Sequence, residues 1–141
     1  MGWSGLRFRP HKKGFEKILG ELEVQVMEVV WRRGEVSVRD VFEELDNKRS
    51  IAYTTVLSTM SNLHRKGFLH RTKSGVAFLY KPAYSRDELA RLAVDEVVTG
   101  LMDGFGQHFL ACLADLHQPK ELVETVARLE KQLAERKKGE Q

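Results

Sequence analysis

The order of helical and β-prone segments between residues 20 and 82 constrains the fold more than any other feature of the chain. Apolar side chains recur at helical spacing in residues 20–34, where a glycine follows two arginines and ends the pattern. A shorter apolar stripe follows in residues 38–45, with Ser37 as a favourable N-cap and Asp40 as its partner in a capping box. These patterns predict a long first helix and a short, amphipathic second helix.

A third helix is expected from about Ala52 to Lys66, with Ser50 as its cap and a glycine after its end. Two short β-prone runs follow, FLHRT and AFLYK, which are joined by residues 73–76 and stopped by Pro82. Residues 35–37 are long enough only for a single β-bridge. Three helices followed by a hairpin are typical of a winged helix-turn-helix domain. The expected fold class is therefore mainly α with a small β-hairpin.

Three parts are expected along the chain. Residues 1–18 are predicted to form a basic N-terminal arm, which lacks periodicity and is expected to be flexible, either as a solvated tail or as a segment that helps to hold the DNA backbone. Residues 19–84 are predicted to form the winged-helix domain, and residues 85–141 a helical dimerisation domain.

The region after residue 84 carries more apolar side chains than three short helices of one chain would cover. Ser85 and Glu88 are expected to cap its first helix, glycines around Gly104 to loosen a join, and Pro119 to precede the last helix. A second copy of the chain, in a C2 homodimer, is expected to cover the apolar face; a self-contained bundle and a partner protein are the alternatives. The side chains expected at the dimer interface are Leu101, Phe105, Phe109, Leu113, Val126 and Leu129.

The distribution of charge indicates a polyanion as the partner of the first part. The formal net charge is only +3, but bases outnumber acids up to Tyr84, and acids outnumber bases after it. No acidic residue lies between Asp46 and Asp87, a stretch that includes the third helix and the hairpin. Because phosphate repels carboxylates, an acid-free basic stretch is typical of nucleic-acid binding.

The third helix has one face that is unusual for a helix exposed to solvent. Ala52, Tyr53, Val56, Met60 and Leu63 share the arc that is expected to pack on the first two helices. The opposite arc holds Thr54, Ser58, Ser61, Asn62 and Arg65. Such short polar residues are poorer helix formers than Glu, Lys or Gln, but they allow a close approach to the major groove of DNA, where arginine pairs with guanine. An ordinary solvated helix is the simpler alternative, and a protein-interaction module would need apolar or mixed-charge residues on this face.

Basic residues on both sides of the third helix are expected to contact the DNA backbone. Arg71, Lys73 and Ser74 lie in or just before the hairpin loop, which would run along a phosphate backbone or the minor groove. Lys48 and Arg49 precede the third helix, where the turn is expected to pass the backbone.

Four motifs carry a resemblance to a known family. They are L-x-x-L-E-x-x-[VIM]-M-x-x-[VL]-W in the first helix, AYTTV in the third, KGFL after it, and a wing that ends in Y-x-P. With them, the chain from about Leu19 to Leu133 resembles the penicillinase-repressor (BlaI/MecI/CopY) family of bacterial winged-helix transcriptional repressors. The resemblance implies a homodimer that binds a palindromic operator in double-stranded DNA. It also implies that Thr54, Thr55, Ser58 and Arg65 lie at the operator.

Two departures from this family leave the inducing signal open. Antibiotic-resistance members are cut at an Asn-Phe bond by a membrane metalloprotease system, whereas the matching segment here, HFLACLADL, has no Asn-Phe. Copper-responsive members end in paired C-x-C motifs, and this chain has one cysteine. An inactivating protease is retained as a candidate partner.

Other chemistries are less favoured. His108 and Cys112 lie one helical turn apart and, with His117, make a metal- or redox-sensing regulator an alternative, although Cys112 also suits an apolar core. No metal or other cofactor is expected, and the sequence lacks the phosphate-binding loop, nucleophile elbow or paired carboxylates that would indicate an enzyme. The lack of a signal peptide and of a run of about 20 apolar residues predicts a cytoplasmic protein without membrane contact.

Overall fold

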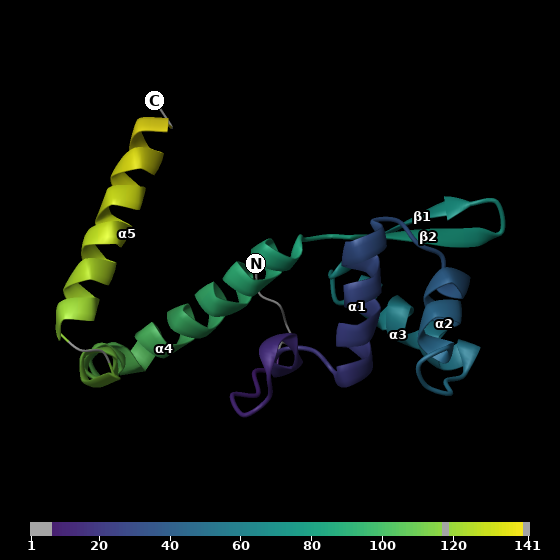
Figure 1. The fold of residues 1–141 in the computed structure, drawn as a ribbon, viewed down its shortest axis with the longest axis horizontal. Helices are drawn as coiled ribbons and strands as arrows, with labels where there is room; N and C mark the ends of the chain where they lie inside the picture. Colours follow the sequence, from purple (N-terminus) through teal and green to yellow (C-terminus); the bar gives the residue numbers. More distant parts are fainter. Residues whose placement is uncertain (1–6, 117–118, 140–141) are drawn as a thin grey trace. The chain divides into compact units, whose positions relative to one another are not determined.

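The first of two compact units carries the winged-helix fold. The computed structural model describes residues 7–116 and 119–139, and the chain divides into Met1–Asp95 and Glu96–Gln141. The elements of the first unit are the 3-10 helix η1 (Gly14–Lys17), α1 (Glu21–Arg33), α2 (Val38–Asp46), α3 (Tyr53–Arg65), β1 (Leu69–Ser74), β2 (Ala77–Pro82) and the start of α4 (Arg86–Leu116) (Figure 1). Three helices followed by an antiparallel hairpin confirm the expected fold class.

The helices and the hairpin of this unit enclose one hydrophobic core. Its deeply buried members include Val26 and Val30 of α1, Val41 of α2, Val56, Met60 and Leu63 of α3, Leu69 of β1 and Tyr80 of β2. The expected single β-bridge is confirmed: Val36 and Tyr80 exchange backbone hydrogen bonds with N–O distances of 3.0 and 2.7 Å. This bridge ties the segment before α2 to the hairpin and fixes where the wing leaves the core.

The start of α2 follows the sequence prediction. The Asp40 N–H donates to the Ser37 hydroxyl at 3.1 Å, and the Ser37 N–H donates to the Asp40 carboxylate at 2.8 Å. These two bonds complete the predicted capping box and satisfy backbone donors that the first turn of a helix leaves unpaired.

α3 begins without a side-chain cap. Its N-cap is Ala52, so the expected cap at Ser50 is wrong. The preceding turn is held from α2 instead, because the Asp46 carboxylate accepts a hydrogen bond from the Ile51 N–H at 3.4 Å. α3 ends as expected, with Gly67 at a φ of +89° after the last turn.

The hairpin is longer and its turn is tighter than expected. Ser74 pairs with Ala77 across the strands, so the turn contains only Gly75 and Val76. Gly75 has a φ of +63°, a conformation that favours glycine. Lys73 and Ser74 therefore belong to β1, and the expected four-residue loop is corrected to two residues.

Part of the expected flexible arm is packed against α1. The ring centroid of Phe15 in η1 lies 4.9 Å from that of Trp31, and Leu19 is only 1% exposed. The Arg9 guanidinium donates to the Leu19 carbonyl. Phe15 and Arg9 of the predicted arm thus contact the winged-helix unit, and the expected flexibility of the arm stays a prediction. Residues 1–6 lie outside the described chain.

The start of α4 belongs to the first unit. Ser85 and Glu88 form the expected capping box, with N–O distances of 2.9 and 3.1 Å, and Leu89 is buried in the core. The compact unit consequently extends to Asp95. The functional boundary expected after Tyr84 stays a prediction.

The second unit consists of helices with exposed side chains. α4 is interrupted at Asp103 and Gly104, where Gly104 has a φ of +87°, and this confirms the expected join. α5 runs over Pro119–Gly139. None of the described side chains from Glu96 onward is buried. Among the residues that the structure describes, no helix is long and apolar enough to cross a membrane.

Candidate nucleic-acid interface

The outward face of α3 is polar and unpaired within the described chain. Val56, Met60 and Leu63 are fully buried on the inner side, as predicted. The expected contact residues are exposed at Thr54, Thr55, Ser58, Asn62 and Arg65 and half-buried at Ser61. Within residues 7–116 and 119–139, none of these six side chains has a hydrogen bond or ion pair, whereas the neighbouring Thr59 hydroxyl donates to its own helix. Their donors and acceptors are therefore available to an external partner.

Two residues of the predicted inner arc are exposed instead. Ala52 and Tyr53 lie at the start of α3, where Tyr53 is 42% exposed and packs edge-on against Phe42 of α2, with ring centroids 5.5 Å apart. Leu57, one turn later, is 40% exposed and was not among the predicted contact residues. Thr54 lies one turn before Leu57 and Ser61 one turn after it, so the helical period alone could have placed Leu57 beside the predicted contact residues.

Cationic side chains gather where α3 ends and β1 begins. Burial, followed by the positive charges of Arg71 and His70, lowers the pKa of His64 below its ordinary value. Arg71 and His70 of β1 thus lie close enough to the last turn of α3 to act on His64. Arg65 adds a guanidinium there, and no carboxylate neutralises it among the described residues.

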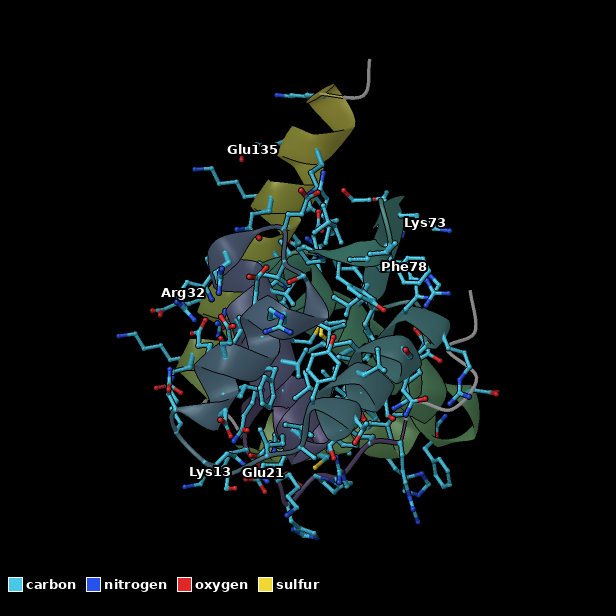
Figure 2. All side chains as sticks on the ribbon, turned by 90° about the vertical axis from the view of Figure 1, so that its right-hand side faces the viewer. Lys13, Glu21, Arg32, Lys73, Phe78 and Glu135 are labelled. Carbon is cyan, nitrogen blue, oxygen red and sulfur yellow. The ribbon has the colours of Figure 1, made fainter. Side chains whose placement is uncertain are left out.

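β1 presents further cations along the wing. Arg71 and Lys73 are two residues apart and so point to the same side of the strand, and the Arg71 guanidinium lies 4.4 Å from the centroid of the Phe78 ring. Phe78 pairs with Lys73 across the strands, and Ser74 is exposed at the end of β1. Figure 2 shows Lys73 and Phe78 together on one side of the first unit and Arg32 of α1 on the other.

The two basic residues before α3 lie beside α1. A guanidinium nitrogen of Arg49 is 3.6 Å from a Glu21 carboxylate oxygen and donates to the Gln25 side chain at 3.4 Å. Lys48 and Arg49 line a groove of about 870 Å³, and its described walls come from α1, α2, the end of β2 and the start of α4. The structure does not bring these two residues together with the α3 face, so their contact with DNA stays a prediction.

The residues predicted for the dimer interface expose apolar surface in the second unit. Leu101, Phe105, Val126 and Leu129 are between 39% and 62% exposed, and Phe109 and Leu113 are half-buried. His108 and Cys112 are also exposed. Across the described residues, no three His, Cys, Asp or Glu side chains are grouped to hold a metal ion, and His117 lies outside that part of the chain.

The fold and the polar α3 face together define a winged helix-turn-helix protein with a cationic contact surface. The family model described as the penicillinase repressor matches residues 19–135. The chain therefore belongs to the penicillinase repressor family, as the sequence motifs predicted.

Individual relatives match about half of the chain. The chain is 42% identical over 79 residues to the transcriptional regulator BlaI of Mycobacterium tuberculosis, which covers 55% of this chain and 57% of that protein. It is 28% identical over 64 residues to the penicillinase repressor of Bacillus licheniformis, covering 45% and 50%. The solution structure of the DNA-binding domain of the repressor BlaI matches with a TM-score of 0.47 and 26% identity, covering 55% of this chain and 92% of that domain. The chain spans about half the length of the curated relatives it matches.

Proposed function

We propose that the protein is a transcriptional repressor that binds a palindromic operator in double-stranded DNA as a homodimer. The observation that carries this proposal is the outward face of α3, where hydroxyl, amide and guanidinium groups are exposed and unpaired within the described chain. Membership of the penicillinase repressor family supports it. So do the names of two relatives, a transcriptional regulator and a penicillinase repressor.

α3 is the element that would read the DNA sequence. The hydroxyls of Thr54 and Ser58 are short enough to let the helix approach the major groove and to donate to phosphates or base edges. The Arg65 guanidinium has the fork geometry that donates two hydrogen bonds to guanine O6 and N7. Because no acidic residue lies between Asp46 and Asp87, this approach brings no carboxylate of that segment against phosphate.

The wing would contribute affinity without reading sequence. Arg71 and Lys73 point to one side of β1, and the Arg71 guanidinium lies over the Phe78 ring in a cation–π contact. Cations placed against phosphates release bound counterions, so their contribution falls as the salt concentration rises. Such contacts fix the position of the protein on the duplex and carry no base information.

The second unit would supply the contact between two copies of the chain. Its exposed apolar side chains, among them Phe105 and Leu129, would be covered by the same surface of a second copy in a C2 dimer. A dimer reads two half-sites at once, and its affinity exceeds that of one winged helix through effective concentration. The repressor would act in the cytoplasm, where bacterial promoter DNA lies, and an inactivating protease remains a candidate partner for release.

The direct test is binding of the purified protein to the intergenic DNA upstream of its own gene. A scrambled duplex of the same composition is the control, a salt series separates base readout from backbone contact, and light scattering gives the mass of the bound species. The expected result is tight, sequence-selective binding by a dimer. Weak binding that is equal on both duplexes and is lost in moderate salt would contradict the proposal and favour a protein-binding role for α3.

Lys73→Ala tests the wing separately. Affinity should fall on the operator and on the scrambled duplex alike, and the slope of log affinity against log salt should become less steep by about one unit. Lys131→Ala removes the same charge from an exposed position on α5, outside the winged-helix unit, and should leave this slope unchanged. A Lys73→Ala protein that keeps the wild-type slope would remove Lys73 from the interface.

A further inference from the structure

Leu57 places an apolar side chain at the edge of the polar face of α3. It is 40% exposed, and Tyr53 one turn earlier is 42% exposed. Its neighbours on the helix surface, three and four positions away, are Tyr53 and Met60 on the side toward the core and Thr54 and Ser61 on the outward side, so Leu57 lies at the edge of the polar face. A single exposed leucine is ordinary on a protein surface. A leucine within a binding face is different from such a residue, because its exposed surface is removed from water when that face binds a partner.

The fold itself leaves part of Leu57 uncovered. The side chains of α3 that face the core, Val56, Met60 and Leu63, are already 0% exposed. On the side toward α2, the edge-on contact between Tyr53 and Phe42 occupies the neighbouring space. The exposed part of the leucine is therefore left for an external partner to cover.

DNA offers one apolar group to such a side chain in the major groove. Base edges there present hydrogen-bond donors and acceptors, and only thymine adds a methyl group, at C5. The hydroxyl side chains of Thr54 and Ser58 allow α3 to approach closely enough for van der Waals contact with that methyl group. We propose that Leu57 is a specificity-determining residue that packs on the C5-methyl group of one thymine in each operator half-site. This inference rests on the proposed function, because it requires α3 to enter the major groove.

The test compares thymine with uracil, which lacks the C5-methyl group and keeps the hydrogen-bonding groups of the base. The full-length wild-type protein first selects an operator from a pool of random duplexes. Each thymine is then replaced by uracil, at the same position in both half-sites. At one position the wild-type affinity should fall by about 15-fold, since one buried methyl group contributes about fourfold and the dimer would lose two.

Leu57→Ala provides the decisive comparison. This variant should bind the thymine and uracil forms of that position equally, and it should keep the wild-type response at every other position. Val94→Ala is a matched control, because it removes an exposed aliphatic side chain, 60% exposed on α4, from outside the α3 face. It should keep the full response to uracil. Circular dichroism should show that both variants remain folded, because neither side chain belongs to the buried core and alanine is a strong helix former.

Two results would overturn the role of Leu57 while leaving operator binding intact. One is a wild-type protein that responds to uracil at no position, and the other is a Leu57→Ala protein that keeps the wild-type response at every position. A wild-type protein that selects no sequence from the pool would instead overturn the proposed function, and the role of Leu57 with it. The selection step therefore separates the two failures.

Discussion

The two units of the chain carry helical apolar repeats of the same kind, but only the first covers them with its own side chains. In Met1–Asp95, the core residues Val26, Val56 and Tyr80 are at most 1% exposed. In Glu96–Gln141, no described side chain is buried, and Leu129 on α5 is 51% exposed. The first unit thus buries its apolar side chains within itself, whereas the described helices of the second unit leave theirs exposed or half-buried.

This difference shows what an apolar stripe on a helix can predict. The stripe indicates that a face will be removed from water, because burial of apolar surface is the main favourable contribution to folding and association. It does not indicate which chain supplies the cover. In the first unit, the bridge between Val36 and Tyr80 and the buried Leu89 close the core within one chain. In the second unit, we propose that an identical chain closes it.

The largest expected effect comes from Leu129→Asp, which would break the proposed dimer. A carboxylate on a buried apolar face has no partner to offset its lost hydration, so the two copies should separate. Light scattering should give half of the wild-type mass. Operator affinity should fall by about 100-fold or more, because each winged helix would then bind its half-site alone.

Ala127→Asp is the control for this change. It introduces the same charge two residues earlier and hence on another side of α5, where the side chain is also exposed. This variant should stay dimeric and keep its operator affinity. If the Leu129→Asp protein remained a dimer, the contact between the two copies would lie elsewhere. The proposal that the second unit buries its apolar side chains against another copy would then be contradicted.

The same substitution made once in each unit sharpens the comparison further. Met60 is 0% exposed in the core, and Met102 is 44% exposed on α4. In the Leu129→Asp background, Met60→Ala should lower the free energy of unfolding by about 2–5 kcal/mol, because it leaves a cavity that the core fills only in part. Met102→Ala should lower it by less than about 1 kcal/mol. Urea denaturation followed by circular dichroism measures both, and equal losses would mean that Met102 is covered within its own chain.

Arg65→Ala tests whether the first unit alone determines the base specificity of operator binding. If Arg65 reads a guanine, the substitution should weaken operator binding by about 1–3 kcal/mol and relax specificity at one base pair, with no change in mass. Arg65→Lys keeps the charge but lacks the guanidinium fork, so it should restore the salt dependence without restoring the specificity. Binding titrations on the operator and on single-base variants distinguish these outcomes. An Arg65→Ala protein with unchanged operator binding would contradict the assignment.

The features that could be predicted from the sequence are those set by neighbours along the chain. The capping box between Ser37 and Asp40 spans three residues, and the break at Gly104 depends on a positive φ that glycine tolerates. The outward polar face of α3 follows from the helical period alone. These predictions needed no knowledge of how distant segments pack.

The features that the sequence did not predict depend on residues far apart in the chain. Phe15 packs on Trp31, and Arg49 meets Glu21, through contacts that no local pattern signals. The position of Leu57 could be read from the helical period, but its exposure depends on how α3 packs against α1 and α2. Tertiary packing thus decided which side chains of the candidate interface stay free.

The smallest expected effect concerns the capping box of α2, whose contribution to stability should not depend on the second unit. Ser37→Ala removes the hydroxyl that accepts the Asp40 N–H, and loss of such an N-cap lowers stability by about 1 kcal/mol. Because the capping box lies wholly within the first unit, the loss should be the same in the wild-type and the Leu129→Asp backgrounds. A loss that differs between the two would show that the units are energetically coupled, which urea denaturation would reveal.

The pH dependence gives this prediction a second readout. Interactions with the backbone and then the side chain of Ser37 lower the pKa of Asp40 below its ordinary value of 3.8. The folded state therefore favours the carboxylate, so its contribution to stability is present above about pH 3.8 and is lost as the pH falls through the lower folded pKa. Asp40→Asn removes the titrating group and should flatten this part of the acid-unfolding curve. An unchanged curve would mean that the cap holds Asp40 equally well in its protonated form, against the direction of its pKa.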